Sequence, residues 1–294
     1  MTGPDFFWTA VRQSSLQKIS GLSLLNEKMK IIDFNDLRRF HQPKPRSHKG
    51  DNGRLLIIAG SEQYHGAALL AATVASKIVD LVYFSSVPEN NQLVQKMKSR
   101  LIDTIVVPRS KVEEYVRKSD VVLIGPGLGV SDETKELVNR LLRHFRRKRF
   151  VLDADAFKVV DKRLLSSKCV VTPHRGEFRL LFGVQPSAQA ALRAARCYGC
   201  VVVLKGSTDY VATSRGLWVN RTGNAGMTKG GTGDVLAGLI AALACTNSLK
   251  VAAIAGVYVN GLAGDRLHAR RSWYFSASDL AGEIPKTLQQ IVRS

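Results

Sequence analysis

A glycine-rich loop in the last third of the chain ends in an aspartate and leads directly into an apolar segment. It runs from Gly223 to Asp234 with the sequence Gly-Asn-Ala-Gly-Met-Thr-Lys-Gly-Gly-Thr-Gly-Asp. Glycine lets backbone N–H groups approach a ligand closely. A helix that begins at Thr232 or Gly233 adds unpaired N–H groups and the positive end of its dipole. This combination predicts a phosphate-binding site.

Asp234 has the residue type and the position of a catalytic base. A carboxylate beside an anion site repels phosphate, so its presence indicates a chemical role, and taking the proton from a hydroxyl that attacks phosphorus is one. The alternative is an ordinary glycine-rich turn with an aspartate in the first helical turn, although such a cap needs only one glycine or one aspartate. The spacing is not that of a P-loop, and no Gly-x-Gly-x-x-Gly follows the first strand.

The elements that must position this loop alternate between apolar strands and helices, which predicts a mainly parallel sheet covered on both faces. The predicted strands are 54–59, 81–85, 104–107, 121–124, 150–152, 169–171 and 201–204, followed by an antiparallel edge hairpin at 210–213 and 217–219. The predicted helices are 66–79, 111–118, 132–147, 176–182, 186–198, 232–245, 250–267 and 277–292.

Ligands of such sheets bind beyond the carboxyl ends of the strands. Polar or glycine-rich segments follow five of these strands, at 60–61, 125–129, 153–155, 172–174 and 205–208, which predicts an enzyme cleft.

Composition places the chain among globular proteins. It has 294 residues, of which 45% are hydrophobic, and four cysteines. No apolar run is long enough to cross a bilayer and no signal peptide begins the chain, so we expect a soluble, cytoplasmic protein. Residues 1–48 are expected to form an N-terminal leader or arm and residues 49–294 one α/β domain. Because Met29 is a second possible start, we expect removal of residues 1–28 to leave a folded, active protein.

The formal net charge of +19 is unusually high. Basic clusters occur at 144–149 and 266–271, both at the C-terminal ends of predicted helices, where cations are favoured. Such charge steers anionic ligands or binds nucleic acid without sequence preference. No recognised nucleic-acid module occurs, and the aromatic residues do not interleave with the basic runs.

Nine segments, taken together and in order, resemble the NAD(P)H-hydrate dehydratases, ribokinase-like enzymes that repair damaged nicotinamide cofactors with the help of a nucleotide. The most specific is Thr-Pro-His-Arg-Gly-Glu-Phe at 172–178. The matching segments span residues 48–290 and are 49–53, 60–61, 66–68, 125–129, 152–155, 172–178, 204–206, 223–234 and 258–265. The resemblance implies a ribokinase-like three-layer α/β/α sandwich with a mainly parallel central sheet.

The resemblance also implies a reaction. Its substrate is the S epimer of NADHX or NADPHX, in which water has added across a double bond of the reduced nicotinamide ring. ADP, or ATP in some members, is expected to phosphorylate the ring hydroxyl, which yields AMP when ADP is the donor; loss of phosphate then regenerates NAD(P)H. Mg²⁺ is expected to arrive mostly with the nucleotide, since no His or Cys grouping has metal-ligand spacing. A homotetramer is expected, as is a separate source of epimerisation, because the leader is too short for the epimerase domain of many homologues.

The resemblance implies roles for individual residues. Asp234 is the expected base, and the backbone of Gly231, Thr232 and Gly233 forms the anion hole. The expected nucleotide contacts are Lys205, Gly206, Ser207 and Thr208. The expected substrate contacts are Ala67, Gly127, Gly129, His174, Asn224 and Asp234, and Asn224 and Lys229 are also expected to organise the phosphates.

Several of these residues have structural alternatives. His174 is also suited to capping a loop, and Lys205 to a surface charge at a strand end. Glu177 fits either the first turn of a helix or a water-mediated Mg²⁺ contact, and Asp153 and Asp155 fit hydrogen bonds to loop backbones. Two other functions compete with the dehydratase. One is a ribokinase-like kinase of a small alcohol or vitamin precursor, and the other is a basic nucleic-acid-binding protein.

Overall fold

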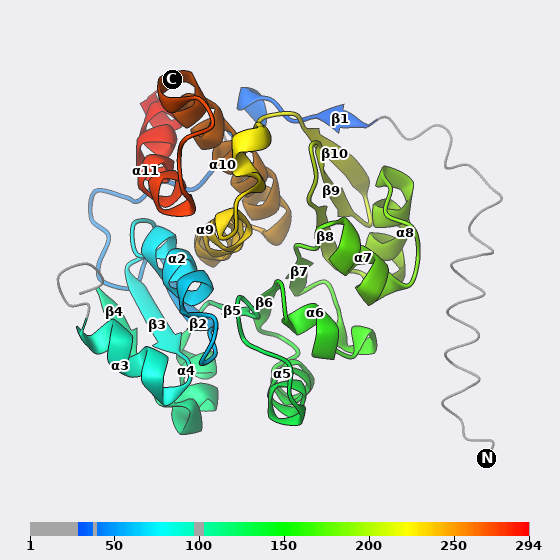
Figure 1. The fold of residues 1–294 in the computed structure, drawn as a ribbon. Coiled ribbons are helices and arrows are strands. Elements are labelled where there is room, and N and C mark those ends of the chain that lie inside the picture. The colour runs from blue at the N-terminus through cyan, green and yellow to red at the C-terminus, as the bar shows by residue number, and fades with distance from the viewer. Residues whose placement is uncertain (1–28, 38–39, 97–102, 294) are drawn as a thin grey trace, which may run out of the picture.

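A ten-stranded sheet with helices on both faces forms the body of the protein (Figure 1). The computed structural model describes residues 29–37, 40–96 and 103–293, so the arm expected at residues 1–28 lies outside the described part. Strands β1 to β10 are arranged in the order β1-β10-β9-β8-β7-β6-β5-β2-β3-β4. This is the three-layer α/β/α architecture expected from the alternation of apolar strands and helices.

Seven consecutive strands of the sheet, from β8 to the outer strand β4, are parallel and place all their carboxyl ends at one edge. They are β2 (Arg54–Ile58), β3 (Leu81–Ser85), β4 (Thr104–Val106), β5 (Val121–Ile124), β6 (Arg149–Leu152), β7 (Cys169–Val171) and β8 (Val201–Leu204). Alternate residues of each strand pack into opposite layers: Leu55 and Ile57 belong to one core cluster, Leu56 and Ile58 to the other. Such strands are apolar throughout because they are covered on both faces.

The hairpin predicted after β8 is present, but it does not form the edge of the sheet. Strand β9 (Asp209–Thr213) pairs antiparallel with both β8 and β10 (Gly216–Asn220). The short strand β1 (Lys30–Ile31) then pairs parallel with β10 on its outer side. Ile32 and Leu37 follow β1 and are buried in the core, only 5% and 3% exposed. Part of the segment expected to be a leader therefore packs on the body.

The helices form one layer on each face of the sheet (Figure 1). One layer contains α2 (His65–Ala75), α9 (Thr232–Thr246), α10 (Leu249–Arg271) and α11 (Ala277–Arg293). The other contains α4 (Val112–Lys118), α5 (Asp132–His144), α6 (Ala156–Val159), α7 (Arg175–Phe182) and α8 (Ala188–Tyr198). Helix α3 (Pro88–Lys96) and the 3₁₀ turns η2 (Phe34–Leu37), η3 (Arg109–Lys111), η4 (Lys162–Leu164) and η5 (Ala225–Thr228) complete the list. Within the described ranges, no helix combines the length and apolarity that a bilayer crossing demands.

Helix α9 is held in place on nearly all sides, because it is apolar almost all round. Its residues from Val235 to Ala244 are buried between the sheet, α2 and α10. Gly238 allows the close crossing with α2, since a Cβ at this position would lie 2.7 Å from the carbonyl oxygen of Ala71. A larger residue at 238 would push the two helices apart. The packing therefore fixes where the N-terminus of α9 lies relative to the strand ends.

Candidate active site

The glycine-rich loop reverses direction at Gly231 and starts α9 at Thr232, where a helix start was predicted. Gly231 has a φ of +96°, a conformation that only glycine adopts without strain. A Cβ at this residue would also lie 2.5 Å from Cδ1 of Leu70 and 2.9 Å from Cβ of Ala277. Glycine is therefore needed at this position for two reasons: the backbone angle is positive, and there is no space for a Cβ between α2 and α11.

Hydrogen bonds of side chains, in the loop and on neighbouring elements, hold the rest of the loop in place. Asp265 of α10 accepts hydrogen bonds from the Gly223 N–H and from Nδ2 of Asn224, each at 2.9 Å. Oγ1 of Thr232 donates to the carbonyl of Met227 at 2.7 Å. The ammonium of Lys229 donates to the carbonyl of Trp273 and lies 5.0 Å from the centre of the Phe275 ring. In this structure the contacts of Asn224 and Lys229 hold the loop itself together.

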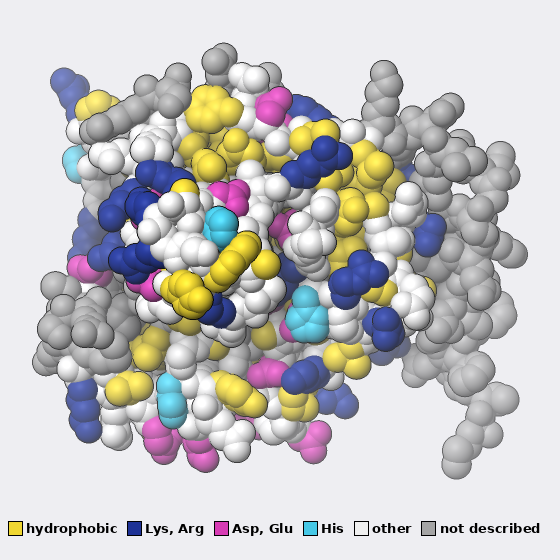
Figure 2. All heavy atoms as spheres, turned by 45° about the horizontal axis from the view of Figure 1, so that its top comes forward, with side chains coloured by type: hydrophobic (Ala, Val, Ile, Leu, Met, Phe, Trp, Pro, Cys, Tyr) yellow, Lys and Arg dark blue, Asp and Glu magenta, His cyan; other side chains and the backbone are white. Residues whose placement is uncertain are grey.

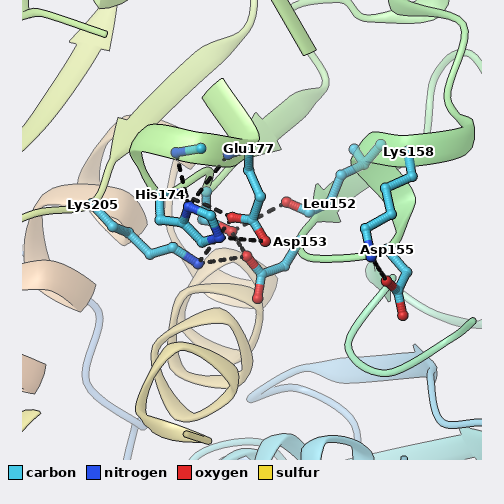
Figure 3. A network of polar contacts seen from close by, with 9 residues as sticks. Leu152, Asp153, Asp155, Lys158, His174, Glu177 and Lys205 are labelled. Atoms are coloured by element: carbon cyan, nitrogen blue, oxygen red, sulfur yellow. Dashed lines mark hydrogen bonds and ion pairs between the residues drawn. The ribbon is translucent and has the colours of Figure 1, made fainter. Parts of the chain in front are cut away.

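Lys205 lies at the centre of a polar cluster beside the start of α9 (Figure 3). Its Nζ is 2.8 Å from Oδ1 of Asp153 and 3.9 Å from Oε2 of Glu177. These residues follow or lie near the ends of β8, β6 and β7, which the parallel register brings together. Oδ1 of Asp153 also accepts a hydrogen bond of 2.7 Å from Oγ1 of Thr172. A Cβ added at Gly233 would lie 3.4 Å from Nζ of Lys205, so the ammonium faces the first turn of α9.

The cluster brings one lysine together with several carboxylates away from solvent. The side chains of Lys205, Asp153 and Glu177 are 17%, 2% and 14% exposed. Burial opposes the charge on Lys205, but Asp153 and Glu177 outweigh it and raise the lysine pKa. Burial raises the pKa of Glu177, an effect that Lys205 counteracts and Asp153 reinforces. The single cation therefore compensates the local negative charge only in part.

The remaining negative charge acts on Asp234. Burial, reinforced by the nearby carboxylate of Asp153, raises the pKa of Asp234 from 3.8 to about 7, although Lys205 opposes the shift. A carboxyl group with a pKa near neutral pH is well matched to accept a proton and release it again. Perturbed acids of this kind are concentrated at catalytic sites.

Two cavities meet at the N-terminal turn of α9. The larger, of about 830 Å³, is lined by Ala67, Gly127, Gly129 and Asp234 together with Asp155. The smaller, of about 440 Å³, is lined on the other side of the turn by residues of the predicted nucleotide site and the glycine-rich loop: Lys205, Gly206, Ser207, Asn224, Thr232 and Gly233. Asp234 on the one hand, and Thr232 with Gly233 on the other, therefore line two different cavities from the same helical turn.

His174, one of the expected substrate contacts, has a structural role in the described structure. Nδ1 of His174 caps α7 by accepting from the N–H groups of Gly176 and Glu177 at 3.0 and 3.3 Å, which is its structural alternative. His174 is not among the described residues that line the two cavities. Neither are Gly231, which forms the turn behind them, and Thr208.

The two aspartates after β6 differ in their contacts. Asp155 accepts a hydrogen bond of 2.9 Å from the N–H of Gly129, which is the backbone contact considered for it. It also pairs with Lys158, to one side of the Lys205 cluster in Figure 3. Asp153 instead bonds the side chains of Lys205 and Thr172. Asp155 therefore shapes the larger cavity and Asp153 places the lysine of the smaller one.

Arg109 is a residue of the site that no motif indicates. It lines the larger cavity from η3, and burial lowers the pKa of its guanidinium to about 10 despite the opposing charge of Glu133. Its Nη1 is buried and has no hydrogen-bond partner among the described residues. A buried N–H group without a hydrogen-bond partner is costly, so this nitrogen is available to an acceptor in the cavity. Only the run of polar loops at the same sheet edge could have drawn attention to it.

Comparison with known proteins agrees with this geometry. The fold and the anion-binding turn define a ribokinase-like protein: a ribokinase-like superfamily protein from Enterococcus faecalis superposes with a TM-score of 0.81 at 26% identity, covering 90% of this chain and 96% of the other. Residues 55–286 match the family model described as NAD(P)H-hydrate dehydratase. The chain belongs to the NAD(P)H-hydrate dehydratase family.

Individual relatives place the chain more closely within that family. An ADP-dependent (S)-NAD(P)H-hydrate dehydratase from Nitrosopumilus maritimus is 37% identical over 268 residues, covering 84% of this chain and 92% of the relative. The bifunctional NAD(P)H-hydrate repair enzyme of Methanocaldococcus jannaschii is 36% identical over 278 residues. This match covers 92% of the chain but only 55% of the longer protein, so the chain spans about half the length of such bifunctional relatives. The ADP/ATP-dependent dehydratase of Bacillus subtilis, co-crystallised with ATP and Mg²⁺, has a TM-score of 0.77 at 26% identity, covering 90% of this chain and 99% of the other.

Proposed function

We propose that this chain dehydrates the S epimer of NADHX and NADPHX to NADH and NADPH, with ADP, or less readily ATP, as the phosphoryl donor. The observation that carries the proposal is that neighbouring residues of one helical turn line two cavities. Asp234 faces the larger cavity, and the turn with Lys205 faces the smaller. This arrangement suits direct phosphoryl transfer between a hydroxyl held in one compartment and a nucleotide held in the other.

The chemistry follows from that placement. Ionised Asp234 takes the proton of the ring hydroxyl while the hydroxyl oxygen attacks the terminal phosphorus of the nucleotide, and AMP leaves when ADP is the donor. The backbone of residues 231–233 and the ammonium of Lys205 stabilise charge on the transferred group. The lone pair of the ring nitrogen then expels phosphate as the C–O bond breaks, and loss of a proton from the adjacent ring carbon reforms the C=C bond of the reduced nicotinamide. General-base assistance of this kind contributes roughly 10²- to 10⁴-fold in rate.

Mg²⁺ is proposed to accompany the nucleotide phosphates. Among the described residues, no three or more His, Cys, Asp or Glu side chains are grouped to hold an ion. This fits an ion held mainly by phosphate oxygens and water, as Mg²⁺ usually is in phosphoryl-transfer sites. The ion supplies neutralisation of phosphate charge.

Location in the cytoplasm and assembly into a homotetramer, which the family resemblance implies, are further proposals, and light scattering on the purified protein tests the tetramer.

Arg109 supports a substrate that carries phosphate, and we assign it to a phosphate group of the dinucleotide. Replacing Arg109 with Gln removes a charge-assisted hydrogen bond, so KM for the hydrate is expected to rise roughly 10- to 100-fold with kcat little changed. Lys111→Gln, at the exposed end of the same 3₁₀ turn, is the matched control and should leave KM unaltered. Equal KM values for wild type and Arg109→Gln would remove Arg109 from substrate binding.

The direct test follows the near-ultraviolet absorbance of NADH as purified protein meets NADHX, Mg²⁺ and either ADP or ATP. Recovery of the NADH band with ADP supports the proposal, and recovery with ATP alone corrects the donor. The competing function, a kinase of a small alcohol or vitamin precursor, predicts no recovery with either nucleotide and a stable phosphorylated product. That outcome, from a protein whose folding is confirmed by its thermal melt, would overturn the dehydratase.

A further inference from the structure

The edge of the sheet opposite the active site carries a groove lined by basic side chains. At the amino ends of β5 and β6, a hollow of about 730 Å³ is lined by six cations and one carboxylate, that of Asp120. The six are Arg117, Arg143, Arg146, Arg147, Lys148 and Arg149. A second hollow of about 380 Å³ shares Arg149 with the first and is lined by three more cations, Lys168, Arg215 and Lys250, with no acidic residue. The two hollows therefore adjoin at Arg149, and together they are called the basic groove, which also contains the first of the clusters noted in the sequence.

Arg117 is paired with Glu113 at 3.9 Å, but the other cations of this groove make no ion pair among the described residues. The Asp120 carboxylate is already paired with Arg54 at 2.8 Å. Arg149 and Lys148 donate to carbonyl oxygens, Arg149 to that of Ala244 at 2.8 Å, and such bonds leave the positive charge uncompensated. The guanidinium groups of Arg143, Arg146 and Arg147 make no ion pair within the described part of the chain, and all three residues are exposed. Exposed clusters of one sign create a strong local potential that attracts a ligand of the opposite sign.

Attraction of the enzyme's own substrates does not account for this groove. The strands between the two sheet edges have three to five residues and span about 10–17 Å at 3.3 Å per residue. The screening length at physiological ionic strength is about 8 Å, so charge at the amino edge acts only weakly on a nucleotide at the carboxyl edge. On the face shown in Figure 2, by contrast, Lys and Arg side chains are spread in several groups with Asp and Glu among them. Steering of the enzyme's own substrates therefore does not explain the groove.

We propose that the groove binds the phosphodiester backbone of nucleic acid without sequence preference. The two hollows are lined by nine cations, and six of these are arginines. A guanidinium group can donate two parallel hydrogen bonds to the oxygens of one phosphate. Two connected hollows suit a linear chain of phosphates better than one small anion. A membrane surface fits less well, because none of the exposed large hydrophobic side chains of the described residues lines the groove.

The test measures fluorescence anisotropy of labelled single-stranded RNA and duplex DNA of about 20 nucleotides, with the full chain, as salt is varied. The variant carries Arg143→Ser, Arg146→Ser and Arg147→Ser. Each lost phosphate contact lowers the slope of log K against log salt by about 0.7 to 0.9, so the slope should fall by about 2 and affinity at low salt by more than about tenfold. The two probes distinguish single strands from duplexes as the form of the backbone that is bound.

The control removes the same charge elsewhere, through Lys111→Ser, Lys135→Ser and Lys286→Ser, at three exposed positions outside the groove. It should keep both affinity and slope, and nucleotide-dependent activity should be unchanged in both triple variants. Equal weakening in the two variants would show general charge attraction and overturn the groove as a site. So would an absence of binding to either probe at low salt, or retention only on vesicles that contain anionic lipid.

Discussion

Replacing Asp234 with Asn should stabilise the protein while it removes turnover. The pKa of Asp234 is about 7 instead of 3.8, a difference of about 3 units, because burial and the carboxylate of Asp153 disfavour its ionised form. At 1.36 kcal/mol per unit, the ionised carboxylate costs the folded state at most about 4 kcal/mol. The side chain keeps partial contact with solvent, so we expect a gain of about 2 kcal/mol, or roughly 4–8 °C in Tm, for the uncharged variant.

The size of this effect depends on pH, and its sign does not change. Below pH 3.8 the carboxyl is protonated in both the folded and the unfolded state, and it costs nothing. As pH rises from there to about 7, only the unfolded state ionises freely, so the wild type loses stability across this window. Above pH 7 the penalty is constant. The difference in Tm between Asp234→Asn and wild type should therefore be largest at alkaline pH and should disappear near pH 4.

The assay pairs thermal melts across this pH range with kinetics. The wild-type kcat/KM should rise tenfold per pH unit on the acid side and level off above about pH 7, as Asp234 ionises in the free enzyme. Asp265→Asn is the matched control, because Asp265 accepts two loop hydrogen bonds and its neutral replacement should lower Tm. An Asp234→Asn protein that is less stable than wild type at pH 8 would refute the reasoning from burial. Near-wild-type turnover in the same variant would refute the role as base, whereas unchanged nucleotide affinity is expected.

Three further predictions concern the scaffold. Lys205→Met leaves a carboxylate that is 2% exposed without its cation and should cost about 3–5 kcal/mol at neutral pH, measured by urea unfolding. Gly231→Ala must take up a φ of +96° and should cost at least about 1–2 kcal/mol, whereas Gly230→Ala, where a Cβ meets nothing within 4 Å, should melt like wild type. Removing residues 1–28 should leave Tm nearly unchanged, and removing residues 1–37 should lower it by several degrees because two buried side chains are lost.

Strands such as β5 and β8 could be predicted because every residue in them is apolar and buried. Helix α3 could not, since its sequence is mostly polar and its buried residues include Asn90. That side chain donates to the carbonyl of Ser61 at 3.1 Å and to Oγ of Ser86 at 2.9 Å, which fixes two loops that line the larger cavity. A buried asparagine looks like a solvated one in a single sequence. The two-residue strand β1 could not be predicted from the sequence either, because only its pairing with β10 makes it a strand.

The same distinction separates what the sequence shows of the site from what it does not. The turn at Gly231 can be predicted from the many glycines around it, because a positive φ restricts the residue at that position to glycine. Two other residues give no such signal in the sequence. Asp265, which holds the start of the loop, lies 31 residues beyond Asp234 on another helix, and Arg109, which lines the larger cavity, lies far before it. Asp265 matters because two hydrogen-bond donors of the loop are left without an acceptor if it is absent. Arg109 matters because its buried Nη1 has no hydrogen-bond acceptor among the described residues. Such needs exist only once the fold has removed the groups from water, so Arg109 can be found only from the structure.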